Sequence, residues 1–119
     1  MKGKLKLFSG QRLESPLNKV TRPTTSKVRE AIINILGNTL YEASWLDLCS
    51  GSGVMACEAL QKGVKRILAI EKERAIALIC KRNLINVSNT LNHPFHIEVK
   101  CREIVSFLKK GPKNKKIEF

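Results

Sequence analysis

The sequence predicts an α/β fold in which a mostly parallel sheet is connected by helices. Three short apolar stretches, at residues 45–47, 67–70 and 95–101, have the length and composition of strands. Each is followed by a segment in which apolar residues recur at helical spacing. Repeated strand–helix alternation gives parallel strands joined by right-handed crossovers, and it places a ligand crevice at the carboxyl ends of the strands.

The N-terminal part of the chain is expected to be an arm followed by a helix. Residues 1–23 are basic and contain two prolines, which favours an extended arm with room for a short strand at 5–8. Ser26 can cap a helix that ends at Gly37. One face of this helix is predicted to be buried, and it carries Val28, Ala31, Ile32, Ile35 and Leu36. The face expected to be exposed carries Lys27, Arg29, Glu30 and Asn34.

The rest of the chain alternates between helices and strands. Helices are expected at 54–61, from about 74 to 87, and at 103–110. In the middle helix the residues predicted to face the sheet are Ile76, Ile79, Cys80, Leu84 and Val87. The stretch 95–101 alternates between apolar and polar residues, which suits an edge strand because a central parallel strand is apolar on both faces.

A glycine turn after the first strand indicates a cofactor-binding loop. Gly51 and Gly53 lack a Cβ, so the backbone can turn tightly and a ligand can lie directly on it. Asp47 stands four residues before Gly51, and its carboxylate suits a cationic ligand such as S-adenosylmethionine better than a pyrophosphate. Glu71 follows the second strand at about the distance where such folds bind ribose hydroxyls. A nicotinamide or flavin cofactor, or a solvated turn, remains an alternative at this point.

Several motifs together resemble the RsmD family of bacterial enzymes. They are Gly10-Gln11-Arg12-Leu13, Arg22-Pro23-Thr24-Thr25 with its Val28-Arg29-Glu30 continuation, Leu46-Asp47-Leu48-Cys49-Ser50-Gly51-Ser52-Gly53, and Glu58-Ala59-Leu60. That family consists of S-adenosylmethionine-dependent guanine-N2 methyltransferases of small-subunit (16S) ribosomal RNA. The resemblance implies the N-terminal part of a Rossmann-like class I methyltransferase domain at 24–119. Its sheet would have three strands and the start of a fourth at 116–119, with helices on both faces.

The resemblance also assigns residues to the cofactor. The implied cofactor-binding set is Thr24, Asp47, Gly51, Gly53, Glu71 and Glu103. Asp47 and the glycines would lie beside the methionine part, Glu71 at the ribose hydroxyls, and Glu103 near the adenine amino group. Glu103 has a second interpretation as the first-turn acid of its own helix, where the positive helix end stabilises it. Family members usually have Asp or Asn at that position.

The charge balance points to a polyanionic partner. The chain has 22 Lys and Arg residues against 10 Asp and Glu residues, a net charge of +12, and a pI near 9.9. The resemblance implies small-subunit ribosomal RNA or the assembling 30S subunit, and a generically basic protein is the alternative. Because aromatic residues are few, phosphate attraction with a strong salt dependence should dominate any RNA contact. The candidate RNA-binding residues are Lys2, Lys4, Lys6, Arg12, Arg22, Lys27 and Arg29.

Other classes of site and segment receive little support. The four cysteines have no C-x-x-C spacing and mostly apolar neighbours, which fits buried thiols in a reducing compartment. His93 and His96 have no further ligand nearby, so no metal site is predicted. No stretch reaches the roughly 20 apolar residues of a membrane span, and no secretory signal is recognised. A cytoplasmic location is therefore expected.

The catalytic signature of the family is expected beyond Phe119. Amino-methylating members carry an Asp-Pro-Pro-Tyr or Asn-Pro-Pro-Tyr loop after the fourth strand, where it orients the flipped base, and this sequence has none. We therefore expect a chain that is truncated relative to the family and inactive in methyl transfer on its own. The alternative is a non-catalytic basic module that binds ribosomal RNA. In the family's fold the fourth strand pairs with the first, so residues 46–48 are expected at an open sheet edge where another chain can pair.

Overall fold

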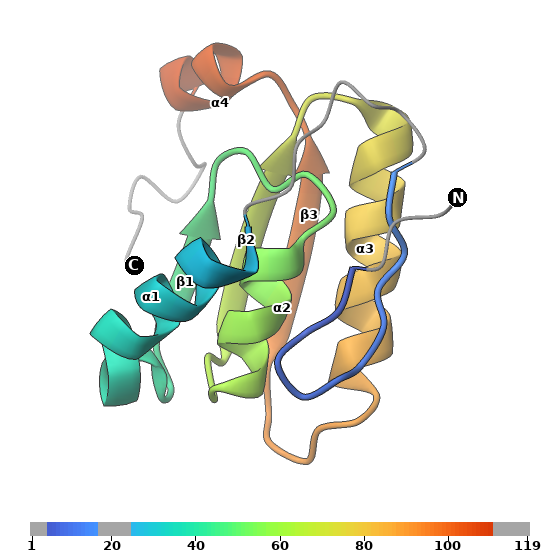
Figure 1. The fold of residues 1–119 in the computed structure, drawn as a ribbon. Coiled ribbons are helices and arrows are strands. Elements are labelled where there is room, and N and C mark those ends of the chain that lie inside the picture. The colour runs from blue at the N-terminus through green and yellow to red at the C-terminus, as the bar shows by residue number, and fades with distance from the viewer. Residues whose placement is uncertain (1–4, 17–24, 111–119) are drawn as a thin grey trace.

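The computed structural model describes residues 5–16 and 25–110, which form a parallel sheet with helices packed against it (Figure 1). The strands are β1 (Ser44–Asp47), β2 (Arg66–Glu71) and β3 (His96–Cys101). The helices are α1 (Ser26–Leu36), the short 3-10 helix η1 (Gly37–Leu40), α2 (Val54–Gln61), α3 (Arg74–Ser88) and α4 (Ile104–Lys110). The strands and α-helices predicted between 26 and 110 are all present. The predicted start of a fourth strand lies outside the described residues.

The sheet has the order β1-β2-β3, and both strand pairs are parallel. In the register of β1 and β2, Leu46 lies opposite Leu68. In the part of the chain that the structure describes, β3 occupies an edge, as its alternating pattern predicts. Its Glu98 carboxylate lies 3.8 Å from nitrogen atoms of His96 and Lys100. Charged groups of this kind discourage pairing along an edge strand. Within the described residues β1 forms the other edge.

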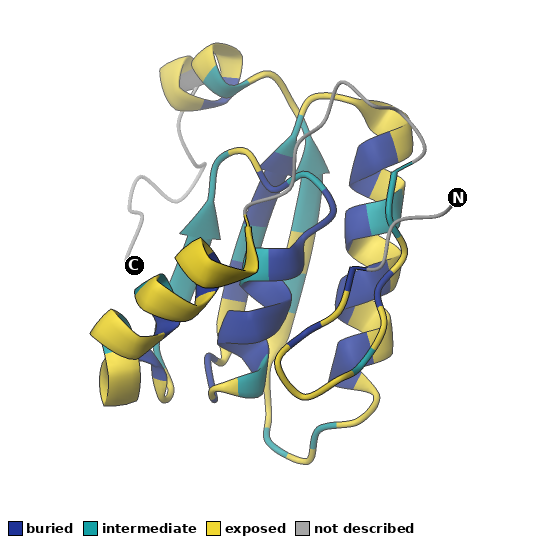
Figure 2. Ribbon diagram, viewed as in Figure 1, coloured by how far each residue is buried: buried dark blue, intermediate teal, exposed yellow. Residues whose placement is uncertain are grey.

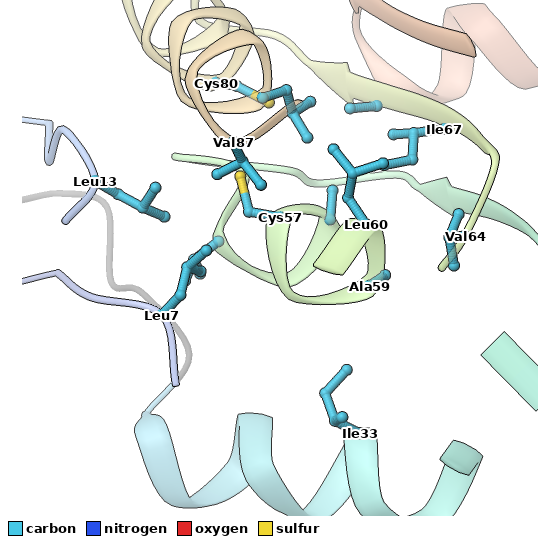
Figure 3. Packing of buried hydrophobic residues seen from close by; sticks show 14 of the residues in the cluster. Leu7, Leu13, Ile33, Cys57, Ala59, Leu60, Val64, Ile67, Cys80 and Val87 are labelled. Carbon is cyan, nitrogen blue, oxygen red and sulfur yellow. The ribbon is translucent and has the colours of Figure 1, made fainter. Parts of the chain in front are cut away.

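Helices α1, α2 and α3 cover one face of the sheet, and α2 contacts both of the others (Figure 1). The hydrophobic core lies between this layer and the sheet, where Leu60 of α2, Ile67 of β2 and Val87 of α3 are buried (Figure 3). Burial of such side chains is the main favourable contribution to folding. α4 lies near the carboxyl ends of the strands (Figure 1). A second helix layer on the opposite face is not seen among the described residues and stays a prediction.

Residues 5–16 pack on the domain and do not extend away from it. They form a hairpin with a single antiparallel bridge, in which the Leu13 N–H donates to the Leu5 carbonyl at 2.9 Å. The side chains of Leu5, Leu7 and Leu13 join the hydrophobic core. The expected extended arm is therefore wrong for this segment, because its alternating leucines give it an apolar side that the core buries. A domain boundary at residue 23 lies outside the described residues.

Helix α1 turns a different face to the core from the one predicted. Its buried residues are Arg29 and Ile33, whereas the exposed fraction is 82% for Ile35 and 48% for Val28. Most of α1 is coloured as exposed in Figure 2. Hydropathy assigns Arg29 to solvent, but the guanidinium meets an acidic partner, Glu58, on α2. A paired charge can be buried, and this pair fixes the rotation of the helix. The apolar residues of the predicted face that are exposed are Val28, Ala31 and Ile35.

The two ends of α1 follow from local chemistry. Thr25, and not Ser26, is the N-cap, because its extended backbone precedes the first turn and its hydroxyl accepts from the Val28 N–H at 3.3 Å. Gly37 ends the helix as predicted, with a φ of 50°.

Candidate functional site

The two acidic residues predicted for the cofactor lie at the carboxyl ends of neighbouring strands. β1 ends at Asp47 and β2 ends at Glu71. Parallel pairing brings both ends to the same edge of the sheet, which is where α/β folds bind ligands. The glycine turn, residues 48–53, leaves this edge and leads into α2. The fold therefore brings together the acids and the turn that the sequence singles out.

Backbone conformation accounts for both glycines of the turn. Gly51 has a φ of 53° and Gly53 a φ of 84°, which are left-handed values that favour glycine. At Gly53 a Cβ would also lie 2.8 Å from the Sγ atom of Cys80 on α3. The Gly53 N–H donates to the Ser50 carbonyl at 2.8 Å, and α2 begins directly after it. A side chain at Gly53 would therefore force the turn away from α3.

Glu71 fastens the glycine turn to the end of β2. Its Oε1 atom accepts from the Gly51 N–H and its Oε2 atom from the Glu73 N–H, both at 3.0 Å. A carboxylate oxygen can accept more than one hydrogen bond. Glu71 can therefore hold the turn and also accept from hydroxyl groups of a ligand.

Asp47 is a partly buried carboxylate next to a second acid. Its Oδ1 atom accepts from the Cys49 N–H at 3.3 Å. Burial has the largest influence on the pKa of Asp47 and raises it, the hydrogen bond from Cys49 lowers it, and the charge of Glu71 raises it further. A cationic ligand would stabilise the ionised form of Asp47. The electrostatics of the site thus favour a positively charged ligand over a phosphate.

A cavity of about 280 Å³ opens beside the two strand ends. Its volume is close to the lower limit of about 300 Å³ for small-molecule pockets. Apolar side chains contribute to its wall, and carboxylates in the wall can accept from N–H and O–H groups of a ligand. This combination suits a nucleoside. The lining residues are Leu48, Cys49, Glu71, Lys72, Glu103 and Ile104.

Glu103 lines this cavity and also caps α4. The Ser106 N–H donates to its Oε1 atom at 3.0 Å. This bond is the main reason that the pKa of Glu103 lies below its ordinary value. Glu103 therefore precedes α4 and is not the first-turn acid that the sequence suggested, although its carboxylate does accept from the first turn of the helix. The contact with adenine stays a prediction.

The exposed basic candidates gather at the start of the domain. Lys6 and Arg12 are exposed, and their backbones lie opposite each other in the antiparallel bridge of the N-terminal hairpin. Lys27 is exposed in the first turn of α1. Four further candidates lie outside the described residues, and these are Lys2, Lys4, Arg22 and the cofactor candidate Thr24.

Arg29 does not belong to this basic surface. Its side chain is 6% exposed, its Nε atom lies 3.9 Å from Glu58 Oε2, and its Nη2 atom donates to the Lys6 carbonyl at 2.8 Å. The predicted exposure of Arg29 is wrong because these buried partners compensate its charge. Its role in the structure is to join α1, α2 and the N-terminal segment.

Sequence patterns do not identify two further residues near the site. Lys72 lines the cavity directly after Glu71. Asn83 of α3 is 1% exposed and donates to the carbonyl of Ser52 in the glycine turn at 2.8 Å. The signal that could have revealed Asn83 is a polar residue three positions after Cys80, on a helix face that is otherwise apolar.

The cysteines differ in their surroundings. Cys57 and Cys80 are buried as predicted, whereas Cys49 is exposed in the cavity wall, and all four thiols are free. In the described part of the chain no group of three or more His, Cys, Asp or Glu residues could hold a metal ion. The helices found there are also too short or too polar to cross a membrane.

Comparison with known sequences identifies relatives of this chain. The family model described as Conserved hypothetical protein 95 matches residues 3–119. The Ribosomal RNA small subunit methyltransferase D of Escherichia coli K12 is 34% identical over 86 residues, which cover 69% of this chain and 43% of that protein. The protein of the same name from Buchnera aphidicola of Baizongia pistaciae is 29% identical over 113 residues, which cover 94% and 55%. This chain spans about half the length of these curated relatives.

Solved structures share the fold. The Escherichia coli protein yhhF, to which a methyltransferase activity is ascribed, superposes with a TM-score of 0.70 at 27% identity. The superposed region covers 91% of this chain and 55% of yhhF. A hypothetical protein from Thermus thermophilus reaches a TM-score of 0.68 at 21% identity, covers 92% and 60%, and supports the fold alone. The family match over residues 3–119, together with these likenesses, shows that the chain belongs to the Conserved hypothetical protein 95 family, the RsmD family that its motifs resemble.

Proposed function

We propose that this chain binds S-adenosylmethionine at the carboxyl edge of its sheet and serves the methylation of guanine N2 in small-subunit ribosomal RNA. One observation carries the cofactor proposal: Asp47 and Glu71 lie at neighbouring strand ends, and Glu71 also anchors the glycine turn. Family membership and the relatives named Ribosomal RNA small subunit methyltransferase D support the RNA substrate. A cytoplasmic location is part of the same proposal.

Each residue of the site would have its own role. S-adenosylmethionine supplies an electrophilic methyl group on a sulfonium. Asp47 would attract the positively charged methionine part, and the left-handed glycines would let that part lie close to the backbone. Glu71 would accept from the ribose hydroxyls. The cavity that includes Glu103 would take the adenine ring, and Thr24 would complete the pocket.

Methyl transfer also requires that the acceptor guanine be held in place, and we assign this role to no residue of this chain. The lone pair of a guanine amino group is delocalised into the ring, so acceptors must turn that group toward the methyl donor. In the family the Pro-Pro-Tyr loop does this. We therefore propose that the 119-residue chain binds the cofactor but does not transfer its methyl group by itself. Transfer from a labelled donor to small-subunit RNA by the purified chain would contradict this part.

The RNA contact is proposed at the exposed cations of the N-terminal hairpin and of α1. Lys6, Arg12 and Lys27 are exposed there, and the chain carries a net charge of +12. If these residues bind phosphates, affinity for RNA should fall steeply between low and moderate salt. A flat salt response would remove RNA from the proposal.

Calorimetric titration of the full chain tests the cofactor proposal. S-adenosylmethionine and S-adenosylhomocysteine should bind, and NADH should bind much more weakly. Asp47→Asn should abolish binding of S-adenosylmethionine and leave RNA affinity nearly unchanged, because the side chain keeps its size and loses its charge. Glu98→Gln is the matched control, since Glu98 is an exposed acid on the outer strand β3. Tighter NADH binding would indicate a nicotinamide site, and RNA binding without any cofactor would favour the non-catalytic module.

A further inference from the structure

The side chain of Asn83 joins three parts of the molecule. It is 1% exposed and projects from α3. Its Nδ2 atom donates to the Glu14 carbonyl at 2.9 Å and to the Ser52 carbonyl at 2.8 Å, and its Oδ1 atom accepts from the Glu14 N–H at 2.8 Å. Both amide donors and the amide oxygen are therefore used. One buried amide connects the N-terminal segment, α3 and the glycine turn.

Neighbouring contacts hold the same three parts together. Arg82, the residue before Asn83, donates from Nε and Nη2 to the two carboxylate oxygens of Glu14 at 2.9 and 2.7 Å. Helix α3 therefore binds Glu14 through its side chain at the surface and through its backbone in the interior. One helical turn earlier, Cys80 lies so close to Gly53 that no Cβ fits between them. Cys80 and Asn83 share a face of α3, and together they fix the turn against the helix.

The position of the turn must depend on this amide. Ser52 stands between Gly51 and Gly53, so a shift of its carbonyl moves the backbone on which a ligand would lie. Leaving buried hydrogen-bonding groups without partners destabilises the arrangement that buries them. Without the Asn83 amide, the turn and residue 14 would move to find other partners or water.

We propose that Asn83 is a positioning residue for the cofactor turn and that it couples this turn to the N-terminal segment. The inference rests on the proposed function. A ligand that fixes the turn also fixes the Ser52 carbonyl, the Asn83 amide and the backbone of Glu14. Coupling between two binding sites is reciprocal. Nucleic acid held by Lys6 and Arg12 of the same segment should therefore strengthen cofactor binding, and the cofactor should strengthen nucleic-acid binding by the same factor.

Cofactor affinity in two matched variants of the full chain tests the positioning role. Asn83→Ala removes the buried amide, and Val87→Ala truncates a fully buried residue one turn further along α3 that does not contact the turn by a hydrogen bond. Both are measured by calorimetry with S-adenosylhomocysteine at a temperature where circular dichroism shows each variant folded. Asn83→Ala should weaken binding by about tenfold or more, and Val87→Ala by about twofold or less. Equal affinity losses in the two variants, or no loss in Asn83→Ala, would overturn the proposal.

Amide hydrogen exchange tests the coupling itself. In the protein without ligand, Asn83→Ala should speed exchange at Glu14 and Gly53, whereas Val87→Ala should not act selectively on them. Adding S-adenosylhomocysteine to the unaltered protein should slow exchange at Glu14, and Asn83→Ala should lose this response. If the unaltered protein binds neither S-adenosylmethionine nor S-adenosylhomocysteine, the proposed function fails. If it binds them and the Glu14 response is absent or survives Asn83→Ala, the coupling alone fails.

Discussion

Replacing Arg29 should destabilise the protein more than replacing an arginine of an exposed ion pair. The guanidinium lies 3.9 Å from the carboxylate of Glu58, and the two side chains are only 6% and 2% exposed. Arg29 also donates to the Lys6 carbonyl at 2.8 Å, and Glu58 accepts from the Phe8 N–H at 3.0 Å. The pair therefore fastens the N-terminal segment to both α1 and α2.

The size and asymmetry of the effect follow from burial. Arg29→Met leaves a buried carboxylate without its cation, and removing one partner of a buried pair costs about 3–5 kcal/mol. Such a loss is a large part of the roughly 5–15 kcal/mol by which domains are stable. Glu58→Gln should cost at least as much, although glutamine can still accept from Phe8, because the buried guanidinium of Arg29 stays charged without its anion. A lone Glu58 carboxylate can instead take up a proton, since burial already raises its pKa. Adding Glu58→Gln to Arg29→Met should therefore restore part of the lost stability.

Urea unfolding followed by circular dichroism measures these free energies. The control is Arg82→Met, which breaks a pair with Glu14 whose side chains are 54% and 45% exposed and should change stability far less. A double variant no more stable than Arg29→Met alone, or a control that costs as much as Arg29→Met, would refute the reasoning.

The stability of the same variants should depend on pH. The raised pKa of Glu58 means that the native state keeps this proton to a higher pH than the unfolded chain does. The stability that it contributes is therefore fully present below the unfolded pKa and is lost as pH rises through the folded pKa. Arg29→Met removes a neighbour that lowers this pKa, so its stability should rise on acidification relative to the double variant. If the difference in stability between Arg29→Met and the double variant does not change with pH, the carboxyl of Glu58 is not buried as a charge in Arg29→Met.

Three further predictions concern the backbone and the thiols. Gly53→Ala should cost roughly 1–3 kcal/mol for left-handed strain and more for the clash with Cys80. Gly10→Ala is the control, because Gly10 has a φ of 95° and open surroundings, so that its replacement introduces strain without a clash. Thermal unfolding compares the two variants, and equal losses of stability would exclude a contribution from the clash. Iodoacetamide followed by mass spectrometry should modify exposed Cys49 while sparing Cys80, whose pKa burial raises to about 11; similar rates would show that the turn opens. Glu42 has a φ of 61°, so Glu42→Asn should raise the urea midpoint, and a lower midpoint would contradict strain there.

Local information in the sequence predicts the elements and the place of the candidate site. Gly37 and Gly53 adopt positive φ values at helix ends, and this property of glycine can be anticipated without a structure. Asp47 and Glu71 follow apolar strands, so parallel pairing alone brings them to one edge of the sheet. These inferences need only the identity of a residue and its close neighbours.

Long-range partners explain what the sequence does not predict. The rotation of α1 depends on Arg29 meeting Glu58. Hydropathy, applied to each of these residues alone, predicts that both are exposed. The packing of the N-terminal segment depends on Asn83 meeting Glu14, 69 positions away. In both cases a polar residue is buried because a distant partner compensates it. No periodicity within one helix contains that information.

The two buried connections change how the basic N-terminal segment can act. An extended arm would lose conformational freedom on binding RNA, which would offset part of the attraction to phosphate. Here Lys6 is held through its carbonyl by Arg29, and Glu14 is held through its backbone by Asn83. Lys6 and Arg12 therefore present their charges from a bridge that is already formed. If RNA binds this segment as proposed, the ordering precedes the encounter, so each cation can contribute more of its attraction to affinity. Strain that the RNA placed on the segment would then reach α1 through Arg29 and the glycine turn through Asn83.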